Sequence, residues 1–124
     1  VREAMPVPAS LSWVEAASIP LVYTVVYDML VVQGHLAADE WLLVVGVASG
    51  VGVAALQMAK ALGAWVIGTS GSAAKLDRLT SQGLDVALCP RQPDFAGAVL
   101  SATGGNGPCA RTCAAAMRII GDMT

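Results

Sequence analysis

The chain has 124 residues, of which 56% are hydrophobic and only 13% are charged, and its net charge is −2. The length fits a single domain, the apolar content excludes intrinsic disorder, and the negative balance offers no basic field for nucleic acid. An ordinary soluble domain has about 25% charged residues. The low charge therefore leaves two alternatives, a membrane segment or a surface that other parts of a protein normally cover.

The elements expected first along the chain are two helices. Ser12 and Glu15 have the spacing of a capping box, which predicts a short helix from Ser12 to about Ser18. Pro20 suits the first turn of a second helix, which is expected to end near Gly34.

The membrane alternative rests on an uncharged stretch of 19 residues, 41–59, which is long enough to span a bilayer. Its character changes halfway along. Bulky and β-branched residues fill 41–45, three glycines and a serine lie within 46–52, and apolar residues then recur at helical spacing up to Leu62, before Gly63. A buried strand, a glycine turn and an amphipathic helix explain this order better than one span, so we expect no membrane insertion.

The second half of the chain repeats the same alternation of strands and helices. We expect strands over 64–69 and 85–88, a helix that begins after Ser72 and ends at Gly83, and a helix over 95–102. Short strands that alternate with helices predict an α/β fold with a parallel sheet and right-handed crossovers.

The glycine-rich turn at 46–52 opens the helix of a strand–helix–strand unit, which is the context that a phosphate-binding turn requires. A pyrophosphate is held by free backbone N–H groups and by the positive end of the helix dipole. The match to G-x-G-x-x-G is imperfect, because Val47 and Ser49 stand where the first two glycines would. The alternative is a tight turn without a ligand. The N–H groups expected to face a ligand are those of Ser49, Gly50, Val51 and Gly52.

The end of the second strand indicates which nucleotide the turn would hold. An NAD site usually has an acidic residue about 20 residues after the glycines, but Ser70 stands in this region. The absence of a carboxylate permits a 2′-phosphate, to which Ser72 can donate and which Lys75 can neutralise. This combination favours NADPH, whereas taken singly Ser72 is equally a helix cap and Lys75 equally a surface lysine.

Metal chemistry is not expected. Cys109 and Cys113 lie four residues apart, and His35 is distant, so no fourth ligand for zinc stands out. With Cys89 they make an odd and sparse set, which argues against disulfides and for a reducing, cytoplasmic compartment. The first four residues lack a basic region followed by an apolar core, so no signal peptide is expected.

The segments at 20–23, 27–30, 44–52 and 57–64 together resemble the zinc-free, zeta-crystallin-like quinone oxidoreductases of the medium-chain dehydrogenase/reductase superfamily. The family turn A-x-x-G-x-x-G corresponds here to Gly46, Ser49 and Gly52. The resemblance implies a partial Rossmann-type doubly wound parallel sheet, preceded by the helix pair. It also places Arg91, with Ser72 and Lys75, near the 2′-phosphate of NADPH.

The same resemblance implies a function, namely hydride transfer from NADPH to a quinone or an enone without a catalytic metal. It divides the chain into a linking segment with the helix pair (1–40), the first half of a nucleotide-binding domain (41–107) and an atypical tail (108–124). It leaves the catalytic residues unknown. It implies a homo-oligomer or further domains of the same fold as partners, and an isolated chain without turnover. The alternative is a non-catalytic, truncated module that binds nucleotide or a partner.

This sequence departs from the family pattern at three places. Val25 and Val26 replace the Thr-Ala that usually precedes Tyr27 near the nicotinamide, and Pro90 replaces a tyrosine before Arg91. The residues after Gly107 lack the strand that the family pattern places there.

Overall fold

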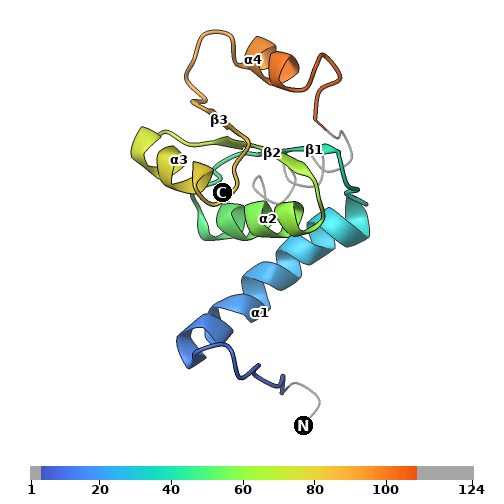
Figure 1. Cartoon of the computed structure of the whole chain (residues 1–124), viewed down its shortest axis with the longest axis vertical. Coiled ribbons are helices and arrows are strands. Elements are labelled where there is room, and N and C mark those ends of the chain that lie inside the picture. Colours follow the sequence, from blue (N-terminus) through green and yellow to red (C-terminus); the bar gives the residue numbers. More distant parts are fainter. Residues whose placement is uncertain (1–3, 109–124) are drawn as a thin grey trace.

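The structure, a computed structural model, describes residues 4–108 (Figure 1). The prediction for the tail, including Cys109 and Cys113, lies outside the described residues. The elements in chain order are α1 (Trp13–Tyr27), a π-helical continuation η1 (Asp28–Gln33), β1 (Trp41–Val44), α2 (Gly50–Ala61), β2 (Trp65–Thr69), α3 (Ala73–Thr80), β3 (Val86–Leu88) and α4 (Phe95–Ala102).

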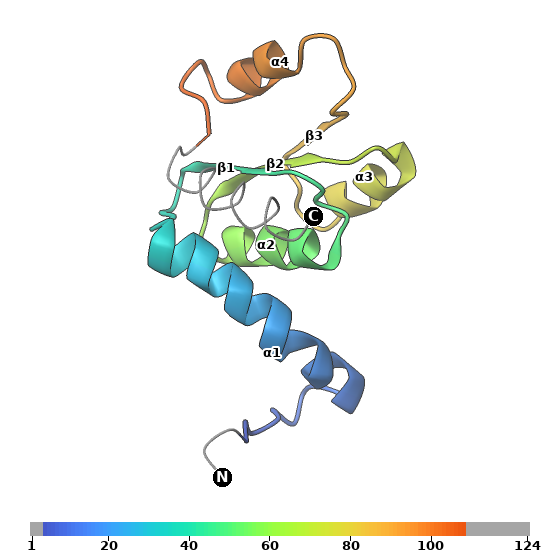
Figure 2. The same cartoon turned by 180° about the vertical axis from the view of Figure 1, so that it is seen from behind.

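The three strands form one parallel sheet in the order β1-β2-β3. In the register, Leu43 lies opposite Ile67, and Ile67 opposite Val86. Helices α2 and α3 lie on one face of the sheet, whereas α4 lies on the other (Figures 1 and 2). A change of face after the third strand is typical of doubly wound sheets, so the predicted α/β fold class is confirmed.

The core lies between the sheet and α2. Leu42 and Val66, from neighbouring strands, are buried with Leu56 and Ala59 of α2 in one apolar cluster. Each fully buried Val or Leu side chain in this cluster stabilises the fold by roughly 1.5–3 kcal/mol relative to leaving it exposed. The cluster fixes α2 against the sheet, and with it the turn that leads into α2.

The capping box at the start of α1 is confirmed, but the predicted break between two helices is wrong. The backbone N–H of Ser12 donates to Glu15 Oε2 at 2.8 Å, and the Glu15 N–H donates to Ser12 Oγ at 3.3 Å. Helix α1 then runs through Pro20 without interruption. Proline removes one intrahelical hydrogen bond, and because Pro20 lies on an exposed stretch of the helix, water can serve the carbonyl that loses its partner.

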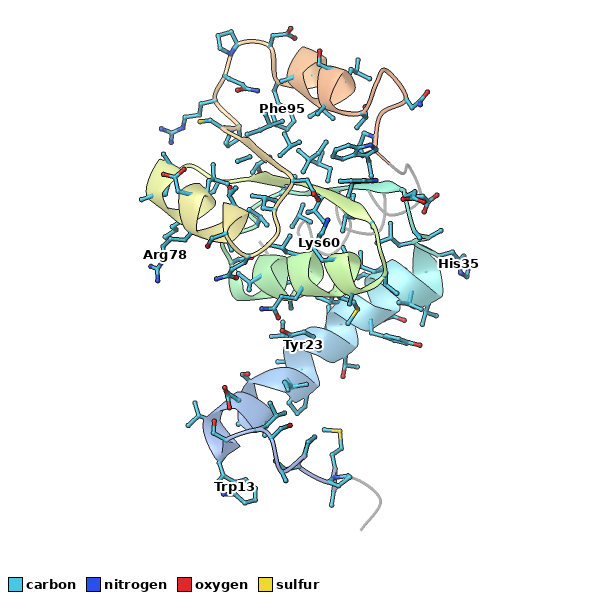
Figure 3. All side chains as sticks on the ribbon, viewed as in Figure 1. Trp13, Tyr23, His35, Lys60, Arg78 and Phe95 are labelled. Carbon is cyan, nitrogen blue, oxygen red and sulfur yellow. The ribbon has the colours of Figure 1, made fainter. Side chains whose placement is uncertain are left out.

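Only the second half of α1 packs against the body of the molecule, where Val26 is buried and the Tyr23 hydroxyl donates to the Gln57 side chain of α2. The first half projects outward (Figure 3). Trp13 and Val14 are 81% and 82% exposed there. Large exposed apolar side chains gathered in one region are typical of an interaction surface.

One described helical segment, Trp13–Gln33, is long and apolar enough to cross a membrane by length and composition. A single helix of this kind is a weak indication, because helices of soluble proteins reach the same values. The stretch 41–59, which raised the membrane alternative, forms a strand, a turn and part of α2 instead of one span.

An ion pair between Lys60 of α2 and Asp85 lies at the amino ends of β2 and β3. Lys60 Nζ lies 2.8 Å from Asp85 Oδ2 and also donates to the Ala64 carbonyl at 3.2 Å. The same carboxylate oxygen accepts the backbone N–H of Val66 at 2.8 Å. Asp85 therefore continues the pairing of β2 and β3 beyond their last backbone hydrogen bond.

Candidate functional site

The candidate site lies where the three strands end. Because the strands are parallel and in register, the residues that follow Val44, Thr69 and Leu88 gather at one edge of the sheet. The Val47 N–H donates to the Thr69 carbonyl at 3.0 Å, and the Ser70 N–H donates to the Leu88 carbonyl at 3.3 Å. Ligands of open α/β sheets bind outside this edge, so the predicted turn has the required position.

The turn between β1 and α2 is held by backbone geometry that favours glycine. Gly46 has a φ of +71°, which side chains disfavour. Its N–H donates to the buried hydroxyl of Thr69 at 3.2 Å, and its carbonyl accepts the Ser49 N–H at 2.9 Å. Thr69 is a contribution that the sequence analysis missed, because nothing in the pattern links a strand-end threonine to a turn 23 residues earlier.

Gly52 lets α2 approach the end of β1. A Cβ atom at this position would lie 2.5 Å from the Gly46 carbonyl oxygen and 2.6 Å from Val47 Cα. A Cβ atom at Gly50 would meet nothing within 4 Å. The two glycines therefore differ in role: Gly52 faces protein, and Gly50 faces open space.

Two of the four N–H groups expected to face a ligand are occupied inside the turn. The Ser49 N–H is bonded to Gly46, and the Gly52 N–H donates to Ser49 Oγ at 3.0 Å, which makes Ser49 the N-cap of α2. Among residues 4–108, the N–H groups of Gly50 and Val51 have no hydrogen-bond partner. These two donors lie at the positive end of a 12-residue helix, which is a ready-made anion site.

The loop after β2 brings Ser70 and Ser72 together. The Ser72 N–H donates to Ser70 Oγ at 3.2 Å. Ser72 occupies the N-cap position of α3, but its side chain makes no capping hydrogen bond, so the cap that the sequence predicted is present in position only. Its hydroxyl has no partner within the described residues and can donate to a ligand.

A hollow of about 270 Å³ lies between the turn and α3. It is lined by Ala48, Val53, Lys75, Arg78, Leu79 and Gln82. Lys75 is thus brought beside the turn. Arg78, labelled in Figure 3, was missed, although its i+3 spacing from Lys75 puts both cations on neighbouring positions of one helix face. Arg91 lies exposed in the loop after β3 and does not line this hollow.

The residues present fit a dinucleotide. Two free N–H groups and the open space at Gly50 suit a pyrophosphate, and Lys75 adds a cation nearby. Among the residues that the structure describes, none that lines the hollow between the turn and α3 carries a carboxylate. For metals, no group of three or more His, Cys, Asp or Glu side chains able to hold an ion is found within residues 4–108, where Cys89 is free and exposed.

Comparison with known proteins identifies relatives that are much longer than this chain. The chain is 40% identical over 104 residues to the highly reducing polyketide synthase easB of Emericella nidulans, a match that covers 82% of this chain and 4% of the synthase. It spans about a third of the solved chains that it resembles.

Three of those structures share the fold and between 32% and 40% of the aligned residues. An NAD-dependent alcohol dehydrogenase matches with a TM-score of 0.79 and 40% identity over 84% of this chain and 30% of its own. The enoyl reductase CurK matches with a TM-score of 0.76 and 32% identity, over 84% and 31%. A quinone oxidoreductase from Pseudomonas syringae pv. Tomato DC3000 matches with a TM-score of 0.73 and 32% identity, over 84% and 32%.

The family model described as zinc-binding dehydrogenase matches residues 50–115, which begin at the first residue of α2. The match covers more than half of the chain and includes the helix that carries the free N–H groups. With the structural neighbours, it implies a nicotinamide cofactor. The chain therefore belongs to the zinc-binding dehydrogenase family, in the medium-chain dehydrogenase/reductase superfamily.

Proposed function

We propose that this chain is the cofactor-binding part of an NADPH-dependent reductase that delivers hydride to an activated double bond, with an enone as substrate. The observation that carries the proposal is the turn at 46–52. Within the described residues, the backbone N–H groups of Gly50 and Val51 in this turn have no hydrogen-bond partner, and Lys75 lies beside the turn. This arrangement holds phosphate groups, whatever the substrate that the remainder of the protein selects.

Each predicted site residue has a part in this proposal. Gly50 and Val51 would bind the pyrophosphate, with Gly46, Ser49 and Gly52 shaping the turn around it. Ser70 would position the Ser72 hydroxyl, which with Lys75 and Arg91 would receive the 2′-phosphate. When bound, the reduced nicotinamide supplies the hydride. The chain's own residues contribute binding and orientation.

The choice of NADPH over NADH rests on charge. An NAD site usually has a carboxylate at the end of the second strand, which bonds the ribose hydroxyls and would repel a 2′-phosphate. Ser70 stands at this end, and Lys75 follows on α3. A cation beside uncharged hydroxyls favours the ligand with the additional negative charge.

An enone is favoured over a quinone as substrate because of the relatives. A highly reducing polyketide synthase is 40% identical to this chain, and CurK, one of the solved neighbours, is an enoyl reductase. Reduction of an enone adds a hydride to one carbon of the double bond and a proton to the other. A quinone remains the second candidate, since a quinone oxidoreductase is also among the neighbours.

We assign no catalytic residue to this chain, which spans about a third of its solved relatives. Further domains of the same fold, or a second copy, are proposed to complete the substrate site. We also propose that the reaction uses no catalytic metal and that the protein is located in the cytoplasm.

The test is a titration of the 124-residue chain with NADPH and with NADH, followed by calorimetry, with Lys75→Ala as the variant. We expect NADPH to bind more tightly, and the preference to fall in the variant while NADH affinity stays the same. Equal affinities that do not depend on Lys75 would overturn the cofactor assignment. Failure to bind either nucleotide would favour a non-catalytic module instead.

A further inference from the structure

Two cations on α3 have no ionic partner in the described part of the chain. Four lysine and arginine residues lie within residues 4–108: Lys60, Lys75, Arg78 and Arg91. Lys60 alone among them forms an ion pair. Lys75 and Arg78 lie three residues apart on one helix, where like charges repel each other, and both line the hollow beside the turn.

The lining of this hollow suits an anion. Its polar members within residues 4–108 are Lys75, Arg78 and Gln82, all of which can donate hydrogen bonds and none of which is a carboxylate. Its apolar members include Ala48, which belongs to the turn at 46–52. An anion in this hollow would therefore lie next to the group held by the turn, and would relieve the repulsion between the two cations.

We propose that Arg78 is a specificity-determining residue, which together with Lys75 binds the 2′-phosphate that distinguishes NADPH from NADH. This inference rests on the proposed function. The guanidinium group offers donors in a fixed planar arrangement that matches phosphate oxygens in pairs, which an ammonium group cannot do. Arg78 thus supplies geometry to the 2′-phosphate, whereas Lys75 supplies charge.

The experiment compares two probes that differ in the 2′-phosphate alone, 2′,5′-ADP and 5′-AMP, by calorimetry on the full chain. We expect Arg78→Gln to weaken 2′,5′-ADP binding about tenfold, as for the loss of one charge-assisted contact, and to leave 5′-AMP affinity unchanged. Arg78→Lys is expected to restore part of the loss. The matched control is Asn106→Asp, at an exposed position in the loop after α4. It lowers the net charge by the same amount as Arg78→Gln and should leave both affinities unchanged.

The outcomes separate this inference from the proposed function. If 2′,5′-ADP binds the original chain and Arg78→Gln binds it equally well, Arg78 has no such role and the proposed function stands. If Arg78→Gln weakens both probes equally, or Asn106→Asp has the same effect, the residue acts through general charge and the inference is wrong. If neither probe binds the original chain, both proposals fail for this chain.

As a readout that needs no ligand, the thermal midpoint of free Arg78→Gln should equal or exceed that of the original chain, because the repulsion with Lys75 is removed. A clear decrease would show that Arg78 serves the fold, and would overturn the inference.

Discussion

The pair Gly50 and Gly52 offers the sharpest test of how the turn works, because the same change to alanine meets opposite surroundings two residues apart. At Gly52 the new Cβ would lie 2.5 Å from a backbone oxygen and 2.6 Å from a backbone carbon. Ordinary contacts begin near 3.4 Å, so α2 or the turn would have to retreat by roughly 1 Å. At Gly50 the Cβ would meet nothing.

The magnitudes follow from two opposing effects. Alanine in place of glycine stabilises a helix by about 0.5–1 kcal/mol, and this gain applies to both positions of α2. Forcing an extra carbon into a packed site costs roughly 1–3 kcal/mol, and this cost applies only to Gly52. We therefore expect Gly50→Ala to equal or exceed the original chain in free energy of unfolding, and Gly52→Ala to fall below Gly50→Ala by about 2 kcal/mol.

Urea unfolding followed by circular dichroism measures this difference, and calorimetric titration with NADPH completes the comparison. The methyl group of Gly50→Ala enters the space beside the two free N–H groups, so this variant should fold normally and bind NADPH more weakly. Equal stability of the two variants would refute the packing argument. Unchanged NADPH binding by Gly50→Ala would refute the proposed approach of the pyrophosphate to this turn.

Two further predictions concern stability away from the turn. Removing Asp85 should lower the free energy of unfolding more than removing Lys60, because the Asp85 carboxylate also accepts the Val66 N–H. In urea unfolding we expect Asp85→Ala to be less stable than Lys60→Met by about 1 kcal/mol. Equal losses of stability in the two variants would contradict this role of Asp85. The hydrogen bonds from Ser12 lower the pKa of Glu15 below its ordinary value of 4.5. The contribution of the Glu15 carboxylate to stability should therefore be present above pH 4.5 and be lost as the pH falls through the lowered pKa. We expect the difference in thermal midpoint between the original chain and Glu15→Gln to disappear in acid for this reason. A difference that persists in strong acid, well below the lowered pKa, would contradict the cap.

Local patterns in the sequence predicted the elements well where one short-range interaction decides the outcome. Ser12 and Glu15 start α1, Asp94 accepts the Gly97 N–H at the start of α4, and Gly63 has a φ of +80° after α2. The uninterrupted α1 was not predicted, because the penalty of Pro20 depends on whether its neighbourhood is exposed. Exposure is set by packing against α2, which a single sequence does not reveal.

The candidate site shows the same limit. The turn at 46–52 could be predicted, since glycine spacing within a strand–helix–strand unit is a local signal. Which of its N–H groups remain free could not be predicted, because Ser49 Oγ and the Gly46 carbonyl occupy two of them. Arg78 was missed because its proposed role depends on a hollow that it lines together with Ala48. These two residues are 30 positions apart in the chain, so no local pattern links them.

The pairing of Lys60 with Asp85 lies at the amino ends of the strands, and the turn and hollow lie at the carboxyl ends. The contacts that stabilise the sheet and the candidate binding site therefore lie at opposite edges of the sheet. We therefore expect substitutions at Ser70, Lys75 or Arg78, where a change of cofactor preference is proposed, to leave intact the edge that joins β2 to β3. In such a fold, the proposed cofactor preference could change in a few mutational steps without loss of the contacts that stabilise the sheet.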